Sequence, residues 1–516
     1  MVWFWAPVVK CMDGRLRMAT ALASGNFNST VSPTNNPLVA RYTITVPDGS
    51  QVSIQFGLTT AYGTSTWQVD APTGGGQVSI LVAGMLASTT YHMAALIHLR
   101  TGTTFGDSDH TFTTGALPTE HLPALSVTAN PASGTPCPGV ELVNLNPMAA
   151  CVADLQGNIL WYYLNQADLL QDGHPMPLRP LSNGNMMALI TNRYTKAKTP
   201  YCVLREFDLA GDTVSNQYGP REIDMPTLNT LLLKVPTHYG RTVQVNYYSH
   251  DFYPMTNGHV ILLCQEFLTV EVDGKNTLVW GDALVDLDDS FTPVWVWSEF
   301  DVLDVNRHPY EWLPDHDWTH CNTIEPTPDG NLLLGVRDQS WVLKLHYANG
   351  TGTGAILWKM GFEGDFTLMR GGEPDPNTAD WFFAQHYPHI LTSANGYITS
   401  LTVVDNGNYR AGTYPNPYSR GLIVNVDEQK LTVEVAWQYP VTPDFYSYWG
   451  GNVVQLPNGN MEICMSRPLP AEPTPVHSFA REVTFQTQEL VWQLDITPPY
   501  AYRCYRIPSL YPGVQW

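Results

Sequence analysis

The chain has 516 residues, a formal net charge of −21 and 11% aromatic residues, with 40 glycines and 40 prolines. That charge argues against nucleic acid or an anionic membrane as a partner, and no apolar run approaches the ~18 residues of a membrane-spanning helix. The content of aromatic residues, Gly and Pro favours an all-β protein with many short strands and tight turns.

The N-terminus reads MVWFWAPVVKCMDGRLRM, where a short apolar start precedes Lys10 and Arg15. This order is wrong for a secretory signal, so the sequence leaves the native compartment open. The cysteines are scattered and form no CxxC motif, which argues against structural zinc. Their even number permits disulfides, but we expect buried free thiols. They are Cys11, Cys137, Cys151, Cys202, Cys264, Cys321, Cys464 and Cys504.

Residues 22–118 predict a small β-sandwich of the fibronectin-III or immunoglobulin-like type. Stretches such as ARYTITV, QVSILVAGML and TYHMAALIHL are separated by turns of Gly, Thr, Asp and Pro. Tyr91 follows a turn, as the tyrosine corner of such domains does. Residues 119–136 are rich in Pro, and we expect a linker there.

Residues 137–516 are repetitive. One signature is an apolar stretch broken by a tight turn, as in LSNGNMMALI and TPDGNLLLGV. Asn-Gly and Asp-Gly between apolar runs predict hairpins with type I′ turns, which need positive φ. The five turn glycines are Gly184, Gly258, Gly330, Gly396 and Gly459.

A second signature is a strand, a turn and a strand that often ends in Trp, as in CVADLQGNILWYY and LIVNVDEQKLTVEVAW. LREFDLAGDTVSNQY is a looser copy. The two signatures alternate at roughly 65–75 residues, longer than a typical ~40–45-residue propeller blade. Two hairpins in each unit make one four-stranded blade, so we expect a six-bladed β-propeller. A sandwich array or a β-solenoid is the alternative.

Three of these units carry a histidine before the turn glycine, at nearly the same repeat position. They are His250 in YYSHDFYPMTNG, His320 in DWTHCNTIEPTPDG and His386 in FAQHYPHILTSANG. Equivalent positions of a propeller converge on its axis, so we expect the three side chains to cluster. A structural role for each single histidine is the alternative.

Strand parity refines this site. His320 and Asn322 are two residues apart and should share a face, and Arg337 follows the same hairpin. A surface salt bridge with Asp338 is the alternative for Arg337. His386 and His389 are three apart, so we expect them to face opposite ways, with His389 in packing. No Asp or Glu stands at the repeat position, which argues against a metal triad, and we predict no metal and no cofactor.

A group of three histidines, one Asn and one Arg suits an anion that carries negative oxygens. Arg offers a bidentate fork, and a neutral imidazole can act as a nucleophile. Transfer of a sulfuryl or phosphoryl group is the natural class of reaction. Phosphoryl transfer commonly uses Mg²⁺ and carboxylates, which the sequence does not place at this position.

Four stretches resemble the arylsulfate sulfotransferases that work without the nucleotide sulfate donor. They are HDWTHCNTIEPTPDGNLLLGVRDQSWVLKL, FAQHYPHILTSANGYITSLTVVDNGNYR, GGNVVQLPNGNMEIC and YRCYRIPSLYPG. The resemblance implies ping-pong transfer of a sulfuryl group from a phenolic sulfate to a phenolic acceptor. Family members are usually exported, which suggests a periplasmic or secreted protein, and their N-terminal part often serves dimerisation, which suggests a homodimer.

Carried over residue by residue, the resemblance implies that His386 is the nucleophile and forms a sulfohistidine. Arg337, His320 and Asn322 would bind the sulfuryl oxygens. His250 would give a proton to the leaving phenolate and take one from the acceptor, a role that needs a pKa near the working pH. The choice of His386 over the other two rests on the resemblance alone.

Two other functions stay open. The same histidines could serve a metal-dependent lyase or hydrolase of acidic saccharides, or the propeller could bind a partner without catalysis. Metal analysis and a search for a covalent sulfuryl adduct separate these three functions.

Overall fold

The computed structural model describes residues 23–25, 27–146, 149–164, 177–191, 202–309, 316–408, 410, 417–441, 445–466, 468–469, 477–498 and 500–516. These residues are nearly all in strands or turns, which confirms the predicted all-β class. One α-helix, α1 (Met225–Leu232), begins where the side chain of Asp224 accepts a hydrogen bond from the Thr227 backbone N–H. No described helix is long and apolar enough to cross a membrane.

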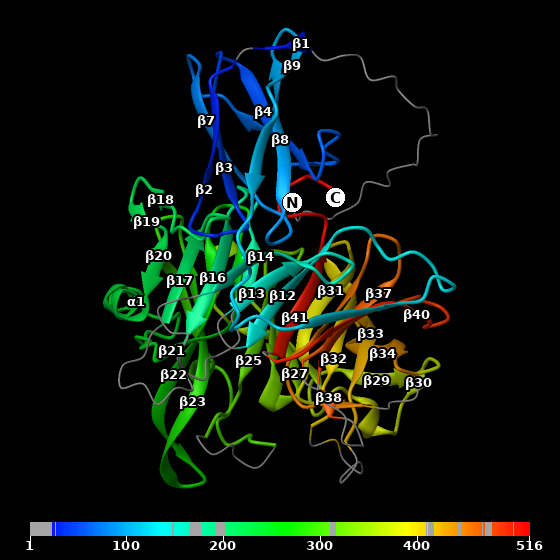
Figure 1. The fold of residues 1–516 in the computed structure, drawn as a ribbon. Coiled ribbons are helices and arrows are strands. Elements are labelled where there is room, and N and C mark those ends of the chain that lie inside the picture. The colour runs from blue at the N-terminus through cyan, green and yellow to red at the C-terminus, as the bar shows by residue number, and fades with distance from the viewer. Residues whose placement is uncertain are drawn as a thin grey trace.

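The N-terminal part consists of two sheets that enclose one apolar core (Figure 1). The Tyr91 hydroxyl accepts a hydrogen bond of 3.0 Å from the Leu86 backbone N–H, which is the contact expected of a tyrosine corner. The larger sheet holds β1 (Ala23–Ser24), β4 (Ser50–Gly57), β5 (Thr64–Ser65), β6 (Val69–Asp70), β8 (Thr90–Leu99), β9 (Thr104–Gly106) and β10 (His110–Thr113), and the smaller β2 (Ser29–Pro33), β3 (Ala40–Val46) and β7 (Gly76–Val82).

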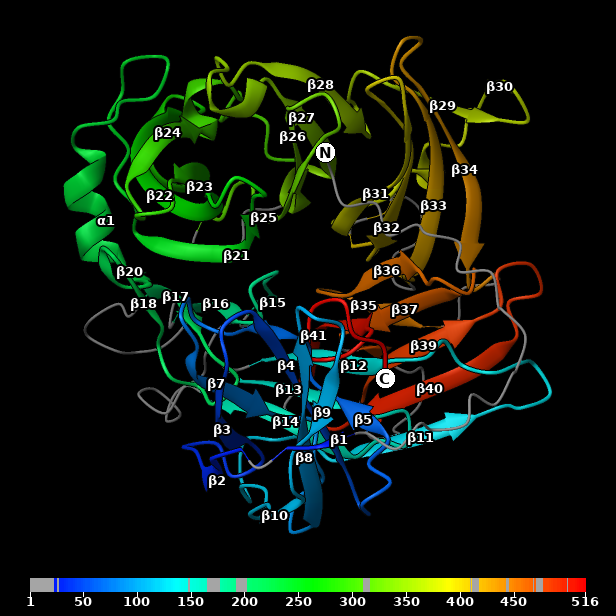
Figure 2. The ribbon, with the colours of Figure 1, turned by 90° about the horizontal axis from the view of Figure 1, so that it is seen from above.

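The remaining chain forms six larger sheets around a common axis (Figure 2), which is consistent with the expected six-bladed propeller. Five of the six run from an inner to an outer strand in chain order. They hold β15 (Leu178–Pro180), β16 (Met186–Thr191), β17 (Cys202–Phe207) and β20 (Glu222–Asp224); β21 (Tyr247–Pro254), β22 (Val260–Val272), β23 (Lys275–Leu287) and β24 (Pro293–Ser298); β25 (Cys321–Pro326), β26 (Leu332–Val336), β27 (Trp341–Leu345) and β28 (Ile356–Gly361); β31 (His386–Ala394), β32 (Tyr397–Asp405), β33 (Arg420–Asp427) and β34 (Thr432–Tyr439), with β29 (Thr367–Arg370) and β30 (Glu373–Pro374) at its outer edge; and β36 (Asn452–Gln455), β37 (Met461–Met465), β39 (Ser478–Val483) and β40 (Leu490–Ile496).

The sixth sheet joins the two ends of this region. Its inner strand is β41 (Tyr500–Ile507), which pairs with β12 (Val140–Asn146), followed outward by β13 (Ala149–Ala153) and β14 (Ile159–Leu164). In addition, β11 (Leu125–Ala129) pairs with β40 and lies within the stretch expected to be a linker. The strand is five residues long among prolines, so composition concealed it. We propose a division into a domain of residues 22–118, a connection at 119–136 and a domain of residues 137–516.

Shorter elements decorate the ring. The 3₁₀ turns are η1 (Glu299–Asp301), η2 (Arg337–Gln339), η3 (Ala348–Gly350) and η4 (Thr378–Asp380), and two small ladders pair β18 (Ser215–Asn216) with β19 (Gly219–Pro220) and β35 (Tyr446–Ser447) with β38 (Pro468–Leu469). Of these, η2 and β35 contribute to the site described below.

All five turn glycines lie between the first two strands of a sheet and have φ between 80° and 90°. The turn type was predicted correctly for only one of them. At Asn395-Gly396 both residues have positive φ, as type I′ requires, whereas elsewhere the glycine alone does. Gly184, for example, donates from its backbone N–H to the Leu181 carbonyl, so it closes a type I turn in the left-handed position.

The recurrent Trp of the second signature joins neighbouring sheets. Five outer-strand indoles donate to an outer turn of the next sheet: Trp161 to the Leu209 carbonyl, Trp295 to Gly352, Trp358 to the Glu428 carboxylate, Trp437 to Phe485 and Trp492 to Leu155, all at 2.8–2.9 Å. At the remaining junction Arg221 donates to the Asp289 carbonyl and stacks on Phe291. That junction belongs to the looser copy, whose sequence lacks the Trp.

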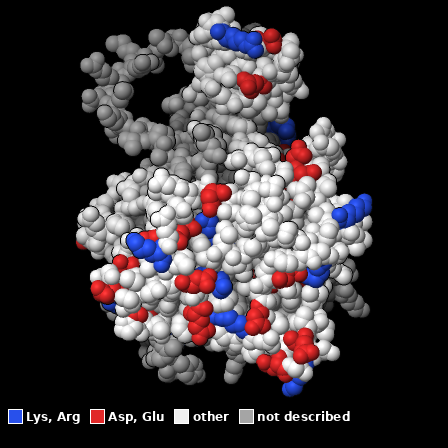
Figure 3. Space-filling model, turned by 180° about the vertical axis from the view of Figure 1, so that it is seen from behind, with Lys and Arg blue, Asp and Glu red and all other residues white. Residues whose placement is uncertain are grey.

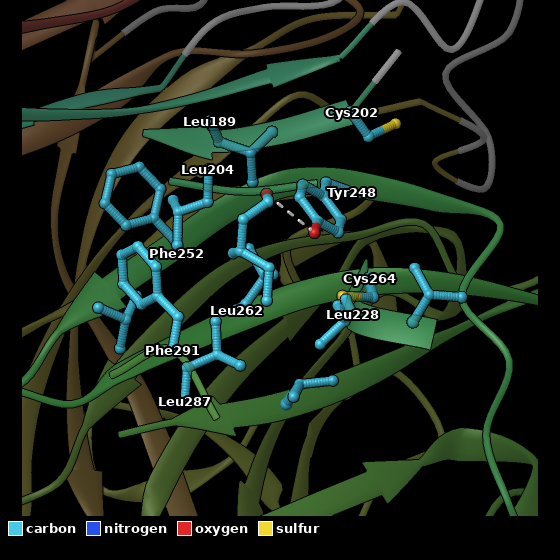
Figure 4. Close-up of a cluster of buried hydrophobic side chains, with 14 of the residues drawn as sticks. Leu189, Cys202, Leu204, Leu228, Tyr248, Phe252, Leu262, Cys264, Leu287 and Phe291 are labelled. Atoms are coloured by element: carbon cyan, nitrogen blue, oxygen red, sulfur yellow. Dashed lines mark hydrogen bonds between the residues drawn. The ribbon is translucent and has the colours of Figure 1, made fainter. Parts of the chain in front are cut away.

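Apolar side chains fill the space between adjacent sheets. Figure 4 shows one such core, in which Leu189 and Leu204 from one sheet meet Phe252 and Leu262 from the next. The Tyr248 hydroxyl is satisfied there by the Ile223 carbonyl at 3.2 Å. The cysteines in the described part of the chain are buried and form no disulfide with one another, as expected. Such cores fix the inner strands, and therefore the side chains that face the axis.

The C-terminal tail connects the two parts of the molecule. The Tyr511 hydroxyl donates to the Leu81 carbonyl (2.9 Å) and accepts from the Ala83 N–H (2.7 Å), and the Trp516 indole donates to the Ser65 carbonyl. A Cβ at Gly84 would lie 2.2 Å from the Trp516 ring, so this position requires glycine. On the face seen in Figure 3, acidic and basic side chains are interspersed among uncharged residues.

Candidate active site

The structure brings the three predicted histidines together near the N-terminal ends of the inner strands. His250 lies in β21, His320 directly precedes β25, and His386 begins β31. The ring centroids of His250 and His320 are 4.5 Å apart, and Tyr502 lies 6.1 Å from His250 and 6.2 Å from His386. We call His250, His320 and His386 the histidine cluster.

Asn406 fixes the protonation of the His386 ring. Its amide nitrogen donates to the carbonyls of Ser447 (2.7 Å) and Gly450 (3.2 Å), so its oxygen faces His386 Nδ1 at 2.7 Å. An amide oxygen can only accept, so Nδ1 carries the proton and Nε2 keeps its lone pair. The neutral ring is therefore held in the tautomer that suits a nucleophile at Nε2.

Burial and neighbouring cations keep this ring neutral. His386 is 1% exposed, and burial lowers its pKa well below 6.5. The positive charge of Arg337 lowers the pKa further, as do His320 and Arg503, while the bond to Asn406 opposes the shift. The lone pair on Nε2 is thus available throughout the neutral range.

His320 has a different partner. Its Nδ1 lies 2.7 Å from the Asp317 carboxylate, which holds the ring and directs Nε2 away from Asp317. The sequence places no carboxylate at the repeat position itself, and Asp317 stands three residues earlier in an irregular segment. His250 has a neutral neighbour instead, with Nδ1 2.9 Å from the Ser249 hydroxyl.

Arg337 lies in η2, beside the cluster. Its guanidinium donates to the Asp338 carboxylate and to the Tyr448 carbonyl at 3.1 Å. The side chains of Arg337 and Asp338 are 8% and 9% exposed, so the ion pair that was weighed as a surface alternative is buried at the site. The pair and the carbonyl together fix the guanidinium next to His386.

Asn322 uses its amide within the protein. Its nitrogen donates to the Gln385 carbonyl at 2.8 Å, and its oxygen accepts from the Thr323 hydroxyl at 3.0 Å. The amide therefore ties β25 to the residue before His386. The parity rule that placed Asn322 beside His320 does not hold here, because His320 has φ 51° and the register shifts between Cys321 and Thr323.

Backbone strain concentrates around the cluster. Ala384 and Tyr387, on either side of His386, have φ of 50° and 51°, and Ser340 has φ 51°. The Ser340 hydroxyl accepts from the Ala384 N–H at 3.0 Å and so holds this conformation. Such angles cost a non-glycine residue about 1–3 kcal/mol, and they gather at functional sites.

Arg503 and Asp251 form a charged layer between the histidine cluster and the rest of the axis. Arg503 in β41 is fully buried and donates to the Asp251 carboxylate (3.2 Å), the Thr323 hydroxyl (3.3 Å) and the Asn322 carbonyl. Its guanidinium lies 4.8 Å from the centroid of the neighbouring Tyr502 ring. Sequence reasoning missed both residues, although they lie in the quoted stretch YRCYRIPSLYPG.

His389 lies elsewhere on the axis, not in packing as expected. Its side chain is 35% exposed, its Nδ1 is 3.1 Å from the Glu325 carboxylate, and its ring stacks on Tyr387. The parity argument failed because β31 has a bulge: His386 pairs with Val404 and His389 with Thr402, so the two residues between them oppose only one on β32. Both histidines therefore face the axis, at different heights.

The described residues include two groups with donors suited to a metal ion. Asp317, His320 and Asp338 approach within 4.8 Å of one another, beside the cluster. In this group Asp317 holds the His320 ring, and Asp338 holds the Arg337 guanidinium, so both carboxylates already have strong hydrogen-bond donors. The adjacent Arg337 cation disfavours a second positive charge there.

The other group is fully buried between β23, η1 and β25. It consists of Asp282, Glu299 and Cys321. The Cys321 thiol donates to Glu299 at 3.0 Å, and burial raises the pKa of Glu299 to about 7. The carboxyl group is thus largely protonated below neutral pH. This group supports the backbone that precedes and follows His320.

Sequence reasoning also missed Asn406, although it lies in the quoted stretch FAQHYPHILTSANGYITSLTVVDNGNYR. Asn406-Gly407 begins the connection from β32 to β33, and only the glycine of this pair has positive φ. Its neighbour Asp405 accepts from Arg420 (2.8 Å) and from Arg410, which anchors the segment. A polar pair at the end of an otherwise apolar strand was the signal available.

The chain matches the model of one protein family over most of its length. The model of the family "Arylsulfotransferase (ASST)" matches residues 131–506, whereas no curated protein matches the sequence. Among solved structures, "NanB plus Optactamide" has a TM-score of 0.30 and 9% identity over 92% of this chain and 69% of that one. "Crystal structure of the tricorn protease" has a TM-score of 0.25 and 10% identity over 88% and 43%. At such scores neither likeness bears on this fold or function. The family match spans most of the chain and includes the entire histidine cluster, and the chain therefore belongs to the arylsulfotransferase family.

Proposed function

We propose that the protein is an aryl sulfotransferase that moves a sulfuryl group from a phenolic sulfate to a phenol through a sulfohistidine at His386. The observation that carries this proposal is the contact between His386 Nδ1 and Asn406 Oδ1 at 2.7 Å. It leaves Nε2 unprotonated, next to the fixed cation Arg337. Membership of the family supports the same class of reaction.

In the first half-reaction, the Nε2 lone pair of His386 attacks sulfur. The N–S bond forms as the S–O bond to the aryl group breaks, and the electron pair leaves with the phenolate oxygen. The ring, still protonated at Nδ1, becomes an imidazolium that carries SO₃⁻. Asn406 stabilises this ring only as a neutral acceptor, which leaves the sulfuryl group ready for transfer.

Arg337 and His320 supply positive charge to the sulfuryl oxygens. Arg337 is fixed by Asp338 and Tyr448, and the Asp317 carboxylate holds the His320 ring. Charge placed in advance in a buried site stabilises the transition state without reorganisation. Asn322 acts in this proposal by holding the Gln385 carbonyl, and thereby His386, rather than by touching the substrate.

His250 acts as general acid and then as general base. It gives a proton to the departing phenolate and takes one from the incoming phenol, whose oxygen then attacks sulfur and returns the electron pair to His386 Nε2. Its ring lies 4.5 Å from His320, and Ser249 holds its Nδ1. The partners proposed are thus a phenolic sulfate donor and a phenolic acceptor, and we keep a homodimer as a further proposal.

The test is intact-mass analysis of the protein after mixing with p-nitrophenyl sulfate. We expect an adduct with the mass of one SO₃ group, which disappears on addition of phenol and is absent from His386→Ala. His389→Ala is the matched control and should retain the adduct. An adduct that survives in His386→Ala would refute the assignment, and activity that depends on a bound metal would favour the lyase or hydrolase alternative.

A further inference from the structure

A second pocket lies on the same axis, beyond the layer formed by Arg503 and Asp251. Its volume is about 760 Å³, within the range of small-molecule sites. Its lining includes the turns that follow the inner strands, such as residues 181–183, whereas the histidine cluster lies near the start of those strands. The two sites therefore occupy opposite ends of the inner strands.

Three tyrosines give this pocket an aromatic wall. Tyr387 lies 5.8 Å from Tyr505, in an edge-to-face arrangement, and 5.6 Å from His389, in a stacked one. Tyr253 lies under the Arg179 guanidinium at 5.4 Å. We call Tyr253, Tyr387, Tyr505, Arg179 and His389 the tyrosine pocket. Within the described residues, none of the three hydroxyls has a hydrogen-bond partner, so they can bind a ligand.

Arg179 and Arg503 bring two guanidinium groups to this wall. Arg179 donates from one nitrogen to Asp251 at 2.8 Å, and Arg503 uses the other oxygen of the same carboxylate. One carboxylate thus serves two guanidinium groups. The Nε of Arg179 is buried and has no hydrogen-bond partner in the described part of the chain.

His389 adds to this charge. Glu325 raises the pKa of His389, although burial and Arg179 act in the other direction. When His389 is protonated, Arg179, Arg503 and His389 face only Asp251 and Glu325, which leaves one positive charge. An anionic group would balance it.

The other cations of the lining are already balanced. Arg221 pairs with Glu206 at 3.1 Å, and Arg506 pairs with Glu141 at 2.9 Å and with Glu482 at 3.2 Å. Burial raises the pKa of Glu141 and of the nearby Glu462 and favours their neutral forms. These pairs therefore leave any uncompensated positive charge among Arg179, Arg503 and a protonated His389.

We propose that the tyrosine pocket is a second binding site, specific for a small aromatic anion. The ring of the ligand would lie against Tyr253, Tyr387 and Tyr505, and its acid group would meet Arg179 and His389. Aromatic contacts and a partly desolvated cation each contribute to affinity for such a molecule. The site is distinct from the sulfuryl-transfer site and does not depend on transfer.

The probe is 2-naphthalenesulfonate, whose sulfonate is joined through carbon and cannot be transferred to His386. Calorimetric titration of the full chain should give a binding component that persists in His386→Ala. Arg179→Gln and Tyr505→Leu should weaken this component at least about tenfold. Arg481→Gln, which removes a partly buried guanidinium outside the pocket, is the matched control, and thermal melting checks that each variant folds.

A second measurement uses the wild-type protein alone. Met255 lines the pocket, so its methyl resonance, assigned with Met255→Leu, should shift on addition of the naphthalenesulfonate. Binding that is unchanged in Arg179→Gln and Tyr505→Leu, or an unmoved Met255 methyl at saturation, would overturn the proposal. Loss of all binding in His386→Ala would likewise assign the ligand to the histidine cluster.

Discussion

His386 and His389 stand three residues apart on one strand, yet their exposure and the partners of their Nδ1 atoms differ. His386 is buried, faces an amide oxygen and lies among cations, so its pKa is lowered. His389 is one-third exposed and faces a carboxylate, so its pKa is raised. The contrast teaches that burial, nearby charges and the partner of Nδ1, not the position in a repeat, together decide whether a ring offers a lone pair or a charge.

The largest expected effect comes from removing the ring of His386, and removal of the His389 ring is the comparison. We expect His386→Ala to lower the rate of sulfuryl transfer about a thousandfold or more, a loss of at least ~4 kcal/mol of transition-state stabilisation. His389→Ala should stay within about threefold, since it removes no group near the reacting atoms. Steady-state transfer from p-nitrophenyl sulfate to phenol measures both. Equal losses in the two variants would end the distinction between the two histidines.

Arg337→Lys tests the cation at the histidine cluster. A lysine keeps the charge but cannot reproduce a fork fixed by Asp338 and Tyr448, so we expect a loss of about a hundredfold in kcat, or ~3 kcal/mol. Arg179→Lys is the corresponding change at the tyrosine pocket and should leave kcat nearly unchanged. Comparison of kcat with KM for the two variants is the measurement, and a full rate in Arg337→Lys would remove the fork from the mechanism.

Asn406→Asp gives His386 a carboxylate partner at Nδ1, as His389 has in Glu325. A carboxylate at Nδ1 stabilises the imidazolium and raises the pKa of His386, so protons compete for the lone pair up to a higher pH. The acid limb of the pH–rate profile should therefore move to higher pH, and we expect the transfer rate at pH 6 to fall about tenfold. The loss should shrink as the pH rises. An unmoved acid limb would show that Asn406 does not control this proton.

Glu325→Gln is the reciprocal change, because it replaces the carboxylate at His389 Nδ1 by an amide. We expect it to have the smallest effect on transfer. Without the carboxylate, burial and Arg179 act unopposed, and the pKa of His389 should fall below 6.5. NMR titration of the histidine ring resonances measures this change, while transfer should remain within about twofold. A raised pKa that persists in this variant would mean that another group sets the charge of His389.

Much of this architecture could be predicted because repeats leave local signals. Apolar runs and turn glycines predicted the hairpins, and a histidine at one repeat position predicted the convergence of His250, His320 and His386. Equivalent positions in a ring must meet at its axis, so this inference needed only register. Turn type was less accessible, because an Asn-Gly pair suits both I′ turns and type I turns with a left-handed glycine.

The groups that tune the site were not predictable in the same way. Asn406 lies 20 residues from His386, Arg503 181 residues from the Asn322 carbonyl that it binds, and Glu325 64 residues from His389. None of the three occupies the repeat position of the histidines. Parity assigned His389 to packing because the bulge after His386 adds a residue that no sequence pattern shows.

The sequence by itself thus determined an all-β chain with repeated hairpins and three histidines in register, because turn residues and side-chain alternation act over a few neighbours. Only the tertiary structure decided which ring keeps a lone pair, which becomes charged and where the positive charge collects. Those properties depend on burial and on hydrogen-bond partners from other sheets, and a linear pattern records neither.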